Sequence, residues 1–340
     1  MAYTTIKKPS DYFDTKLYTG NNSSNHSITV GLEPSFTWIK SVDGTYDHRL
    51  FDTVRGATKD LVCNNSDAQA TSSTSLTAFT TDGFTLGNEG GVNSGGPFVS
   101  WNWLANGAGS ANTDGSISST VSANTTSGFS IVKYTGTGSV ATVGHGLGVK
   151  PAMIIVKRLN TLEDWGIYHQ SMGASKYINL NTTASEQSST SRWNGTEPTT
   201  SVFTITGNAP VNGSGDTYIA YCFAEKQGYS KFGSYTGNGS STDGTFVYTG
   251  FKPAFVMGKY TGGTGDWYLW DSKRLGYNPD NNKIKPNTSD AETTQDWIDM
   301  YSNGFKFFNN SGDFNYSGYN FIYMAFAEEP LVGDNPATAR

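Results

Sequence analysis

The sequence predicts an all-β protein made of three tandem antiparallel β-sandwich repeats, of jelly-roll or lectin-like type and roughly 100 residues each. Three observations lead to this prediction. One ten-residue line occurs three times in the 340 residues. Many short runs are apolar on both alternating faces. Charged residues are only 15% of the chain, and Ser, Thr, Asn and Gly, which favour turns and strand surfaces, take their place.

The repeated line begins with glycine, has proline at its fourth position and ends with lysine. Its copies are GLEPSFTWIK at 31–40, GVKPAMIIVK at 148–157 and GFKPAFVMGK at 250–259. Five more features recur around each copy in one order: a YTG tyrosine, an aspartate, an asparagine, a phenylalanine and an aromatic residue that opens a closing line. The matching residues are Tyr18, Tyr134 and Tyr235; Asp47, Asp164 and Asp266; Asn64, Asn181 and Asn287; Phe84, Phe203 and Phe305; Phe98, Tyr218 and Phe321. These matches indicate a tandem repeat.

The apolar runs are typical of strands that are covered on both sides. The clearest are SFTWIK at 35–40, AMIIVK at 152–157, YIAYCFA at 218–224 and FIYMAFA at 321–327. They are too short for helices and rich in aromatic and branched residues. A strand that is apolar on both faces is sandwiched between two layers. The proline of each line fits the start of a strand, where its missing N–H costs least.

The repeat divides the chain into six segments. They are an N-terminal segment at 1–11, repeats at 12–105, 128–226 and 227–329, a Gly/Ser/Thr/Asn-rich stretch at 106–127, and a C-terminal tail at 330–340. The stretch at 106–127 is either a flexible linker or an exposed arm that adds a strand elsewhere.

Composition argues against several classes of protein. The net charge is −6 and no Lys/Arg cluster is present, which argues against a nucleic-acid partner. The longest apolar runs are far shorter than the ~18 residues of a membrane helix, so we expect no membrane insertion. The opening MAYTTIKKPSD has no apolar core and does not resemble a secretory signal. Cys63 and Cys222 are expected to be buried free thiols.

The search for chemistry predicts no catalytic residue, no metal site and no cofactor. No P-loop or nucleophile elbow is present, and the four histidines lack ligand spacing. Asp47 with Asp52, and Asp266 with Asp271, resemble paired catalytic acids. Their separation of five points the two side chains of a regular strand to opposite faces, and the middle repeat has His169 at the second position.

Structural roles fit these aspartates better. The repeated lysine and the aspartate seven residues later bracket a predicted hairpin, so Lys40–Asp47 and its two counterparts are expected to face each other. Asp52 and Asp271 are each followed three residues later by arginine, at Arg55 and Arg274, which indicates a contact within a turn.

Four aromatic residues in polar loops are candidates for ligand contact. They are Trp193, Trp297, Tyr316 and Tyr319. An exposed ring beside Asn, Asp or Gln stacks on the apolar face of a sugar, while the polar neighbours bond its hydroxyls. Subunit interfaces favour the same residues, so the ligand is either a glycan or a neighbouring subunit.

Several long lines of the chain resemble a known group of proteins. These lines are GFSIVKYTG at 128–136, GHGLGVKPAMIIVKR at 144–158, YIAYCFAEK at 218–226, FGSYTGNG at 232–239, IYMAFAE at 322–328 and PATAR at 336–340. They resemble repeat-containing structural proteins of marine tailed bacteriophages, over nearly the whole chain. The group offers no functional residues to transfer.

The resemblance implies a non-catalytic virion structural protein, made in the bacterial cytoplasm, that forms a tail fibre or tail appendage and contributes to host attachment. Its expected partners are other virion proteins, a host-surface glycan and further copies of itself, since fibres are commonly trimers. A capsid decoration or head-fibre protein is the first alternative. A virion enzyme that degrades polysaccharide is the second, although no convergent acid pair supports it.

Overall fold

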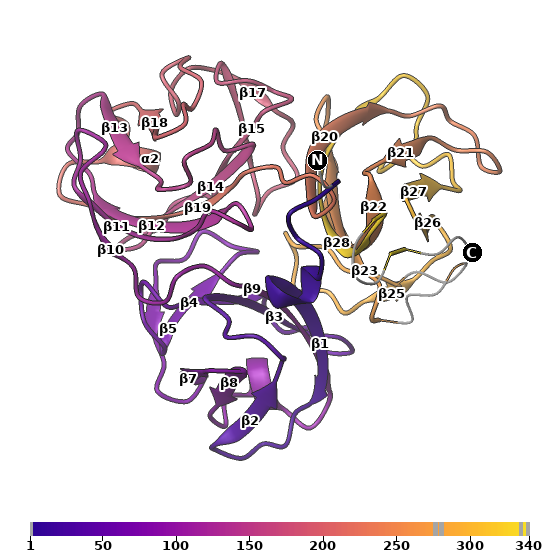
Figure 1. Cartoon of the computed structure of the whole chain (residues 1–340), viewed down its shortest axis with the longest axis horizontal. Helices are drawn as coiled ribbons and strands as arrows, with labels where there is room; N and C mark the ends of the chain where they lie inside the picture. The colour runs from indigo at the N-terminus through magenta and orange to yellow at the C-terminus, as the bar shows by residue number, and fades with distance from the viewer. Residues whose placement is uncertain (1–2, 275–277, 279–281, 333–335, 338–340) are drawn as a thin grey trace.

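A computed structural model describes residues 3–274, 278, 282–332 and 336–337. The protein is all-β, with 43% strand and 3% helix, and its strands form several antiparallel sheets. Three lobes surround a common centre, and each contains one large sheet (Figure 1). We call them the first, second and third lobes in chain order. The predicted all-β class with antiparallel sheets is therefore confirmed.

The large sheets share one order of strand pairing. The first runs β1 (Phe13–Thr19), β9 (Pro97–Trp103), β3 (Phe36–Ser41), β4 (Arg49–Asp52), β5 (Lys59–Val62), β6 (Ala70–Thr71). The second runs β10 (Ser110–Asn112), β11 (Ser119–Asn124), β12 (Phe129–Thr135), β19 (Thr217–Phe223), β14 (Met153–Arg158), β15 (Gly166–His169), β16 (Lys176–Asn179), β17 (Gln187–Ser188). The third runs β20 (Ser230–Thr236), β28 (Asn320–Pro330), β22 (Phe251–Tyr260), β23 (Trp267–Asp271).

Smaller sheets and short helices cover the outer faces of the large sheets and the places where lobes meet. The small sheets are β2 (His26–Thr29), β8 (Gly83–Leu86), β7 (Leu76–Thr80); β13 (Ala141–Gly144), β18 (Val202–Ile205); β21 (Phe246–Tyr248), β27 (Gly304–Phe307), β26 (Ile298–Tyr301); and β24 (Asn282–Lys283), β25 (Thr293–Thr294). The short helices are a 3-10 turn at Pro9–Asp11, α1 (Gly90–Asn93) and α2 (Ala209–Asn212).

The largest apolar cluster lies where the lobes meet, and residues from all three build it. Trp103, Phe223 and Phe326 occupy the same place in the three closing strands, β9, β19 and β28. Their ring centroids are 6.3, 6.0 and 5.6 Å apart, so the three rings contact one another pairwise. The closing strands therefore meet at one shared core.

The predicted two-faced burial of the apolar runs is confirmed. Every residue of β3 is buried, and β14, β19 and β28 are buried over most of their length. One face of each large sheet contributes to the shared core. The other face packs on a smaller sheet of its own lobe in a separate apolar cluster. Two apolar faces are needed because neither face meets water.

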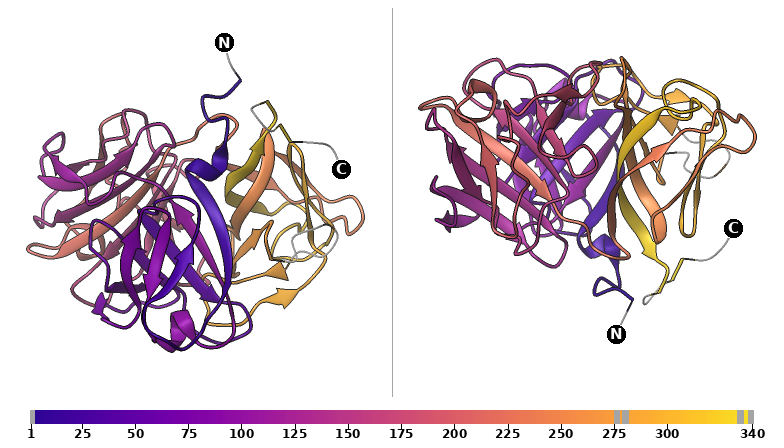
Figure 2. Two further views of the ribbon diagram at one scale, coloured as in Figure 1. Left: turned by 60° about the horizontal axis from the view of Figure 1, so that its bottom comes forward. Right: turned by 90° about the horizontal axis from the view of Figure 1, so that it is seen from above.

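The stretch at 106–127 contains β10 and β11, which extend the second large sheet beyond β12. We call these residues the arm. The opening segment also packs inward, because Ile6 is 1% exposed and belongs to the shared core. The first described residues, from Tyr3, and the end of β28 lie on the same side of the molecule (Figure 2). Within the tail at 330–340, residues 333–335 and 338–340 lie outside the described residues.

Both cysteines are free and buried, as predicted. In the part of the chain that the structure describes, no helix has the length and apolar character needed to cross a bilayer.

Candidate functional site

Asp52 and Asp271, the second aspartate of each pair that resembles catalytic acids, lie at joints between lobes. Asp52 accepts hydrogen bonds from Arg55 Nε at 2.5 Å and from the hydroxyl of Tyr221, in the second lobe, at 2.8 Å. Both aspartate–arginine contacts predicted from the sequence are confirmed, the second by Arg274 Nε 2.6 Å from Asp271. These carboxylates are fully buried and already bonded, so their geometry serves packing between lobes rather than a substrate.

The same joint recurs around the centre. Trp101 Nε1, in the first lobe, donates to Asp271 Oδ2 of the third lobe at 3.1 Å. The third lobe has Met324 where the others have Trp101 and Tyr221, so it has no donor there. At that joint His169 of the second lobe donates instead, from Nε2 to the carbonyl of Tyr323 at 3.1 Å. Its Nδ1 accepts from Ser171 N–H, which leaves the proton on Nε2.

A second set of bonds follows the same circuit. The residue after each repeated aspartate donates a ring N–H to a backbone carbonyl of the preceding lobe, the third lobe preceding the first around the ring. The bonds are His48 to Lys285 O at 3.1 Å, Trp165 to Val62 O at 3.0 Å and Trp267 to Asn179 O at 2.9 Å. The three acceptors also occupy matching places in the sequence, immediately before Cys63, Leu180 and Pro286. The lobes are thus joined in a ring.

The repeated lysines do not pair with the repeated aspartates, so the expected facing pairs are wrong. Lys157 Nζ donates to the carbonyls of Glu163 at 2.6 Å and of Ser66, in the first lobe, at 2.9 Å. The aspartates instead accept from the repeated asparagines, for example Asn64 Nδ2 to Asp47 at 2.8 Å. Burial lowers the pKa of all three lysines to about 8, because the charged form loses its hydration. Backbone carbonyls replace that hydration, from its own lobe for Lys40 and from both its own and the neighbouring lobe for Lys157 and Lys259.

Trp193 is not exposed, contrary to the expectation from its polar neighbours. Its side chain is 2% exposed and belongs to the apolar cluster of the second lobe. The ring meets Tyr168 edge-on, with centroids 6.1 Å apart. A buried ring offers no face to a sugar, so we exclude Trp193 as a ligand contact.

Trp297 is half-buried and its ring is already covered. Lys283 Nζ lies 3.4 Å from the ring centroid, and the ring of Phe314 lies 5.4 Å away. An ammonium over an indole face is a favourable cation–π contact. This occupied face removes most of the stacking surface on which the expectation depended.

Tyr316 and Tyr319 lie together at the surface, as candidate contacts should. Tyr316 is 49% exposed, and its ring centroid is 4.6 Å from that of Tyr319. Tyr319 also stacks on Tyr260 of β22, with centroids 4.3 Å apart and ring planes at 10°. We call these three residues the tyrosine platform. Sequence reasoning missed Tyr260, because it ends a buried strand line and its partner is 59 residues away.

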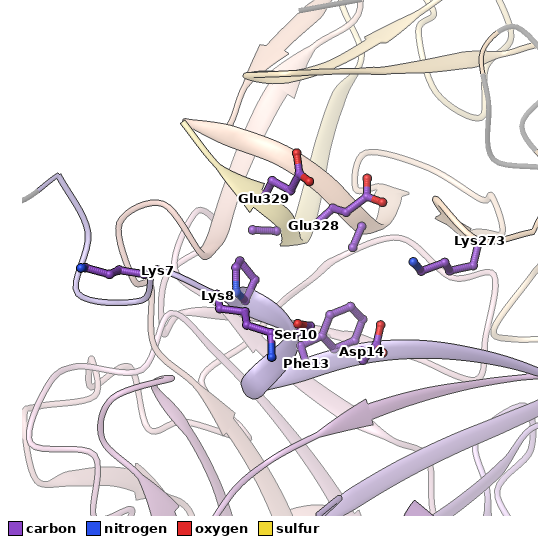
Figure 3. A pocket seen from close by; sticks show the side chains of 11 residues that line it. Lys7, Lys8, Ser10, Phe13, Asp14, Lys273, Glu328 and Glu329 are labelled. Atoms are coloured by element: carbon purple, nitrogen blue, oxygen red, sulfur yellow. The ribbon is translucent and has the colours of Figure 1, made fainter. Parts of the chain in front are cut away.

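Two cavities lie along β1, between the first and third lobes. One, of about 340 Å³, is lined by Phe13 and Asp14 of the first lobe and Glu328 of the third. Figure 3 shows Lys273 pointing into this space from the opposite side to Lys8. The other, of about 420 Å³, also includes Lys273 in its lining. Charges of both signs therefore face this joint.

Comparison with family models yields one match. A model described as a domain of unknown function, DUF7483, matches residues 8–330. The chain belongs to the DUF7483 family. Comparison with curated proteins finds no match.

The DUF7483 chain has no group of three or more His, Cys, Asp or Glu side chains able to hold a metal ion among its described residues. A cavity of about 420 Å³ also lies between the second and third lobes, along β20. Among the described residues, what the geometry offers for binding is the tyrosine platform and the joint of the first and third lobes, which is lined by two cavities. The platform had a sequence signal in the FNYSGYN loop, at 314–320. The joint had none, because its two sides are more than 200 residues apart.

Proposed function

We propose that this DUF7483 protein is a non-catalytic structural and attachment module of a bacteriophage virion. The virion assignment rests on the resemblance of its repeated lines to phage structural proteins. In this proposal the fold is three tandem β-sandwich repeats arranged around a pseudo-threefold centre. The matching ring contacts and inter-lobe bonds support that arrangement.

The observation that carries attachment is the tyrosine platform. Tyr319 stacks on Tyr260, and the tilted ring of Tyr316 contacts Tyr319, so the rings are held in place without a bound ligand. Asn320 follows Tyr319 directly and is exposed, and Ser317 next to Tyr316 is exposed as well. A pre-ordered aromatic face beside amides and hydroxyls suits a carbohydrate, because little conformational entropy is lost on binding. We propose a host-surface glycan as the ligand.

Two structural features support a binding role over hydrolysis. In each carboxylate pair that could serve a glycosidase, the second member, Asp52 or Asp271, is buried and hydrogen-bonded within a joint. The platform itself consists of tyrosines with neutral neighbours in its loop, and stacking alone does not cleave a glycosidic bond. Weak stacking at one platform would be multiplied by the copies present on a virion.

The test compares binding and cleavage in one experiment. Purified protein is incubated with polysaccharide from the host surface; retention of the polysaccharide and release of oligosaccharides are both measured. We expect retention without release. The double variant Tyr316→Ala/Tyr319→Ala should weaken binding about tenfold, equivalent to about 1.4 kcal/mol. Tyr316→Phe keeps the ring and should bind nearly as the wild type does.

A matched control removes an exposed tyrosine elsewhere. Tyr46 is 42% exposed and lies in the first lobe, away from the platform, so Tyr46→Ala should leave binding unchanged. If the platform variants bind as the wild type does, the platform is not the glycan site. Steady release of oligosaccharides by the wild type would make the protein an enzyme and overturn the proposal.

A further inference from the structure

The three lobes differ at one edge of their large sheets. Tyr18, Tyr134 and Tyr235 mark the same place on β1, β12 and β20, and each stacks on the first aromatic residue of its closing line, with centroids 5.0–5.3 Å apart. In the second lobe the arm covers the outer edge of β12, because β11 pairs with it from Ser119 to Asn124. In the described residues β1 and β20 each end their sheet.

The outer edge of β1, which faces away from β9, presents backbone groups that pair with no strand among the described residues. Leu104 N–H bonds to Tyr12 O, and Gly20 N–H bonds to Gly96 O, so even-numbered residues of β1 face β9. Odd-numbered residues therefore direct their N–H and C=O groups outward. Leu17 is central among them, and its side chain is 43% exposed. Such an edge is a template for another strand.

The outer edge of β20 is capped at Phe232, although a cavity of about 420 Å³ lies along its later half, at Ser234, Tyr235 and Thr236. The outward carbonyl of Phe232 accepts from Gln170 Nε2 at 2.6 Å. Its outward N–H lies 3.5 Å from Glu225 Oε2. On β1, by comparison, Asp14 Oδ1 caps Thr15 N–H, and the outward groups of Leu17 have no hydrogen-bond partner among the described residues.

The space beside β1 is already hollow. The cavities of about 340 and 420 Å³ lie along its two halves, the first at Phe13 and Asp14 and the second from Leu17 to Thr19. Lys273 lines both of them. It makes no ion pair within 4 Å among the described residues, whereas its neighbour Arg274 is held by Asp271 and Glu292.

A buried hydroxyl in the same joint has no partner. Ser272 follows Asp271, and its Oγ is buried without a hydrogen bond. Thr53 follows Asp52 at the matching place in the first lobe, where the arm passes. There Thr53 Oγ1 donates to the carbonyl of Gly107, at the start of the arm, at 2.5 Å. A buried hydroxyl normally has a partner, and at one joint the arm supplies it.

We propose that the outer edge of β1 binds an extended segment of a partner protein, which pairs antiparallel with β1 as β11 pairs with β12. The segment has small and β-branched side chains like those of β11, with an acidic side chain near Lys273. Backbone pairing provides the affinity, and the cavities on either side of Lys273 select the side chains.

A peptide copied from the arm of this protein can serve as the probe for this site. A fluorescent peptide of residues 117–126, ISSTVSANTT, carries the β11 sequence. Its binding to the full-length protein is measured by anisotropy. The intact arm should keep its own place on β12 because it is tethered there. Saturable binding to wild type is expected, together with slower amide exchange at residues 15–19 of β1.

Proline variants test the edge itself. Leu17→Pro removes one outward N–H without breaking a bond to β9, which an edge strand tolerates. It should weaken peptide binding at least tenfold, whereas Leu17→Ala, with the N–H intact, should bind within about threefold of wild type. Ser234→Pro makes the matching change on β20 and should have no effect. A peptide with proline at Ser122, whose N–H faces β12 in the native arm, should fail to bind.

Three results would overturn the proposal. The first is no binding of the peptide at millimolar concentration. The second is equal binding by Leu17→Pro and Leu17→Ala. The third is a wild-type dimer in sedimentation that Leu17→Pro converts to monomer, because a second copy would then occupy β1. If Leu17→Pro does not fold, amide exchange of the wild type with peptide decides the question, and unchanged exchange at residues 15–19 contradicts the proposal.

Discussion

Single residues in this protein hold whole lobes together. The joint of the second and third lobes has a histidine donor because Met324 supplies none on the closing strand. A donor placed on one side of the joint thus replaces a donor missing from the other. Since an unpaired buried polar group costs about 1–3 kcal/mol, this exchange leaves the Tyr323 carbonyl with a partner at the joint.

His169 makes the joint sensitive to acid. Burial lowers its pKa from 6.5 to about 4, because the charged ring would lose its hydration. Between these values the unfolded chain takes up a proton that folded His169 does not, so stability falls as pH falls through this window. The slope contributed is at most about 1.4 kcal/mol per pH unit.

The variant His169→Gln tests this dependence. Glutamine keeps an N–H donor for Tyr323 O and does not titrate. Urea unfolding between pH 7 and pH 4.5 should show a flatter loss of stability in the variant than in wild type, with a small difference at pH 7. Buried His48, also with a lowered pKa, is common to both proteins and cancels in the comparison. Parallel profiles would show that His169 does not titrate with the shift given.

At the scale of elements, the closing strands β9, β19 and β28 are the central strands around which the large sheets are built. Each is central in its large sheet, paired on both sides, and buried on both faces. Their central position explains why aromatic residues occur on both faces of these strands. The side chains on one face pack in the shared core, and those on the other face pack within their own lobe.

Truncating the closing strands should therefore be costly. Phe223→Ala and Phe326→Ala each remove a ring that is at most 2% exposed in the shared core. Each should lower the free energy of unfolding by about 3–5 kcal/mol, from lost burial and an unfilled cavity. Phe246→Ala, at a ring 43% exposed on β21, is the control and should cost less than about 1 kcal/mol. Urea melts that show similar small losses for all three would contradict this placement of the core.

At the scale of the molecule, the lobes form one packing unit. The face that each large sheet turns to the centre is apolar and has no cover except the other two lobes. A lobe separated from the others would expose that face to water, which is unfavourable in proportion to its apolar area. Domains that are joined only by a linker share no such buried apolar face.

The whole chain should accordingly unfold in one transition. Calorimetry should give a calorimetric enthalpy close to the van't Hoff value, as expected for two-state unfolding. Phe326→Ala, in the third lobe, should shift this single peak without splitting it. Fragment 128–226 expressed alone should be poorly folded. Three separable transitions, or a stable isolated fragment, would show that the lobes are independent.

The sequence by itself determined the all-β class, the strands β3, β14, β19 and β28, and the contacts of Asp52 with Arg55 and of Asp271 with Arg274. These depend on alternation and on neighbours in the chain, so local sequence carries them. Only the tertiary structure decided that Trp193 is buried, that Tyr260 meets Tyr319, that the repeated lysines bond to carbonyls, and that β1 is an open edge while the arm covers β12. Burial and edge exposure depend on which sheet faces which, and those contacts join residues distant in sequence that no local pattern specifies.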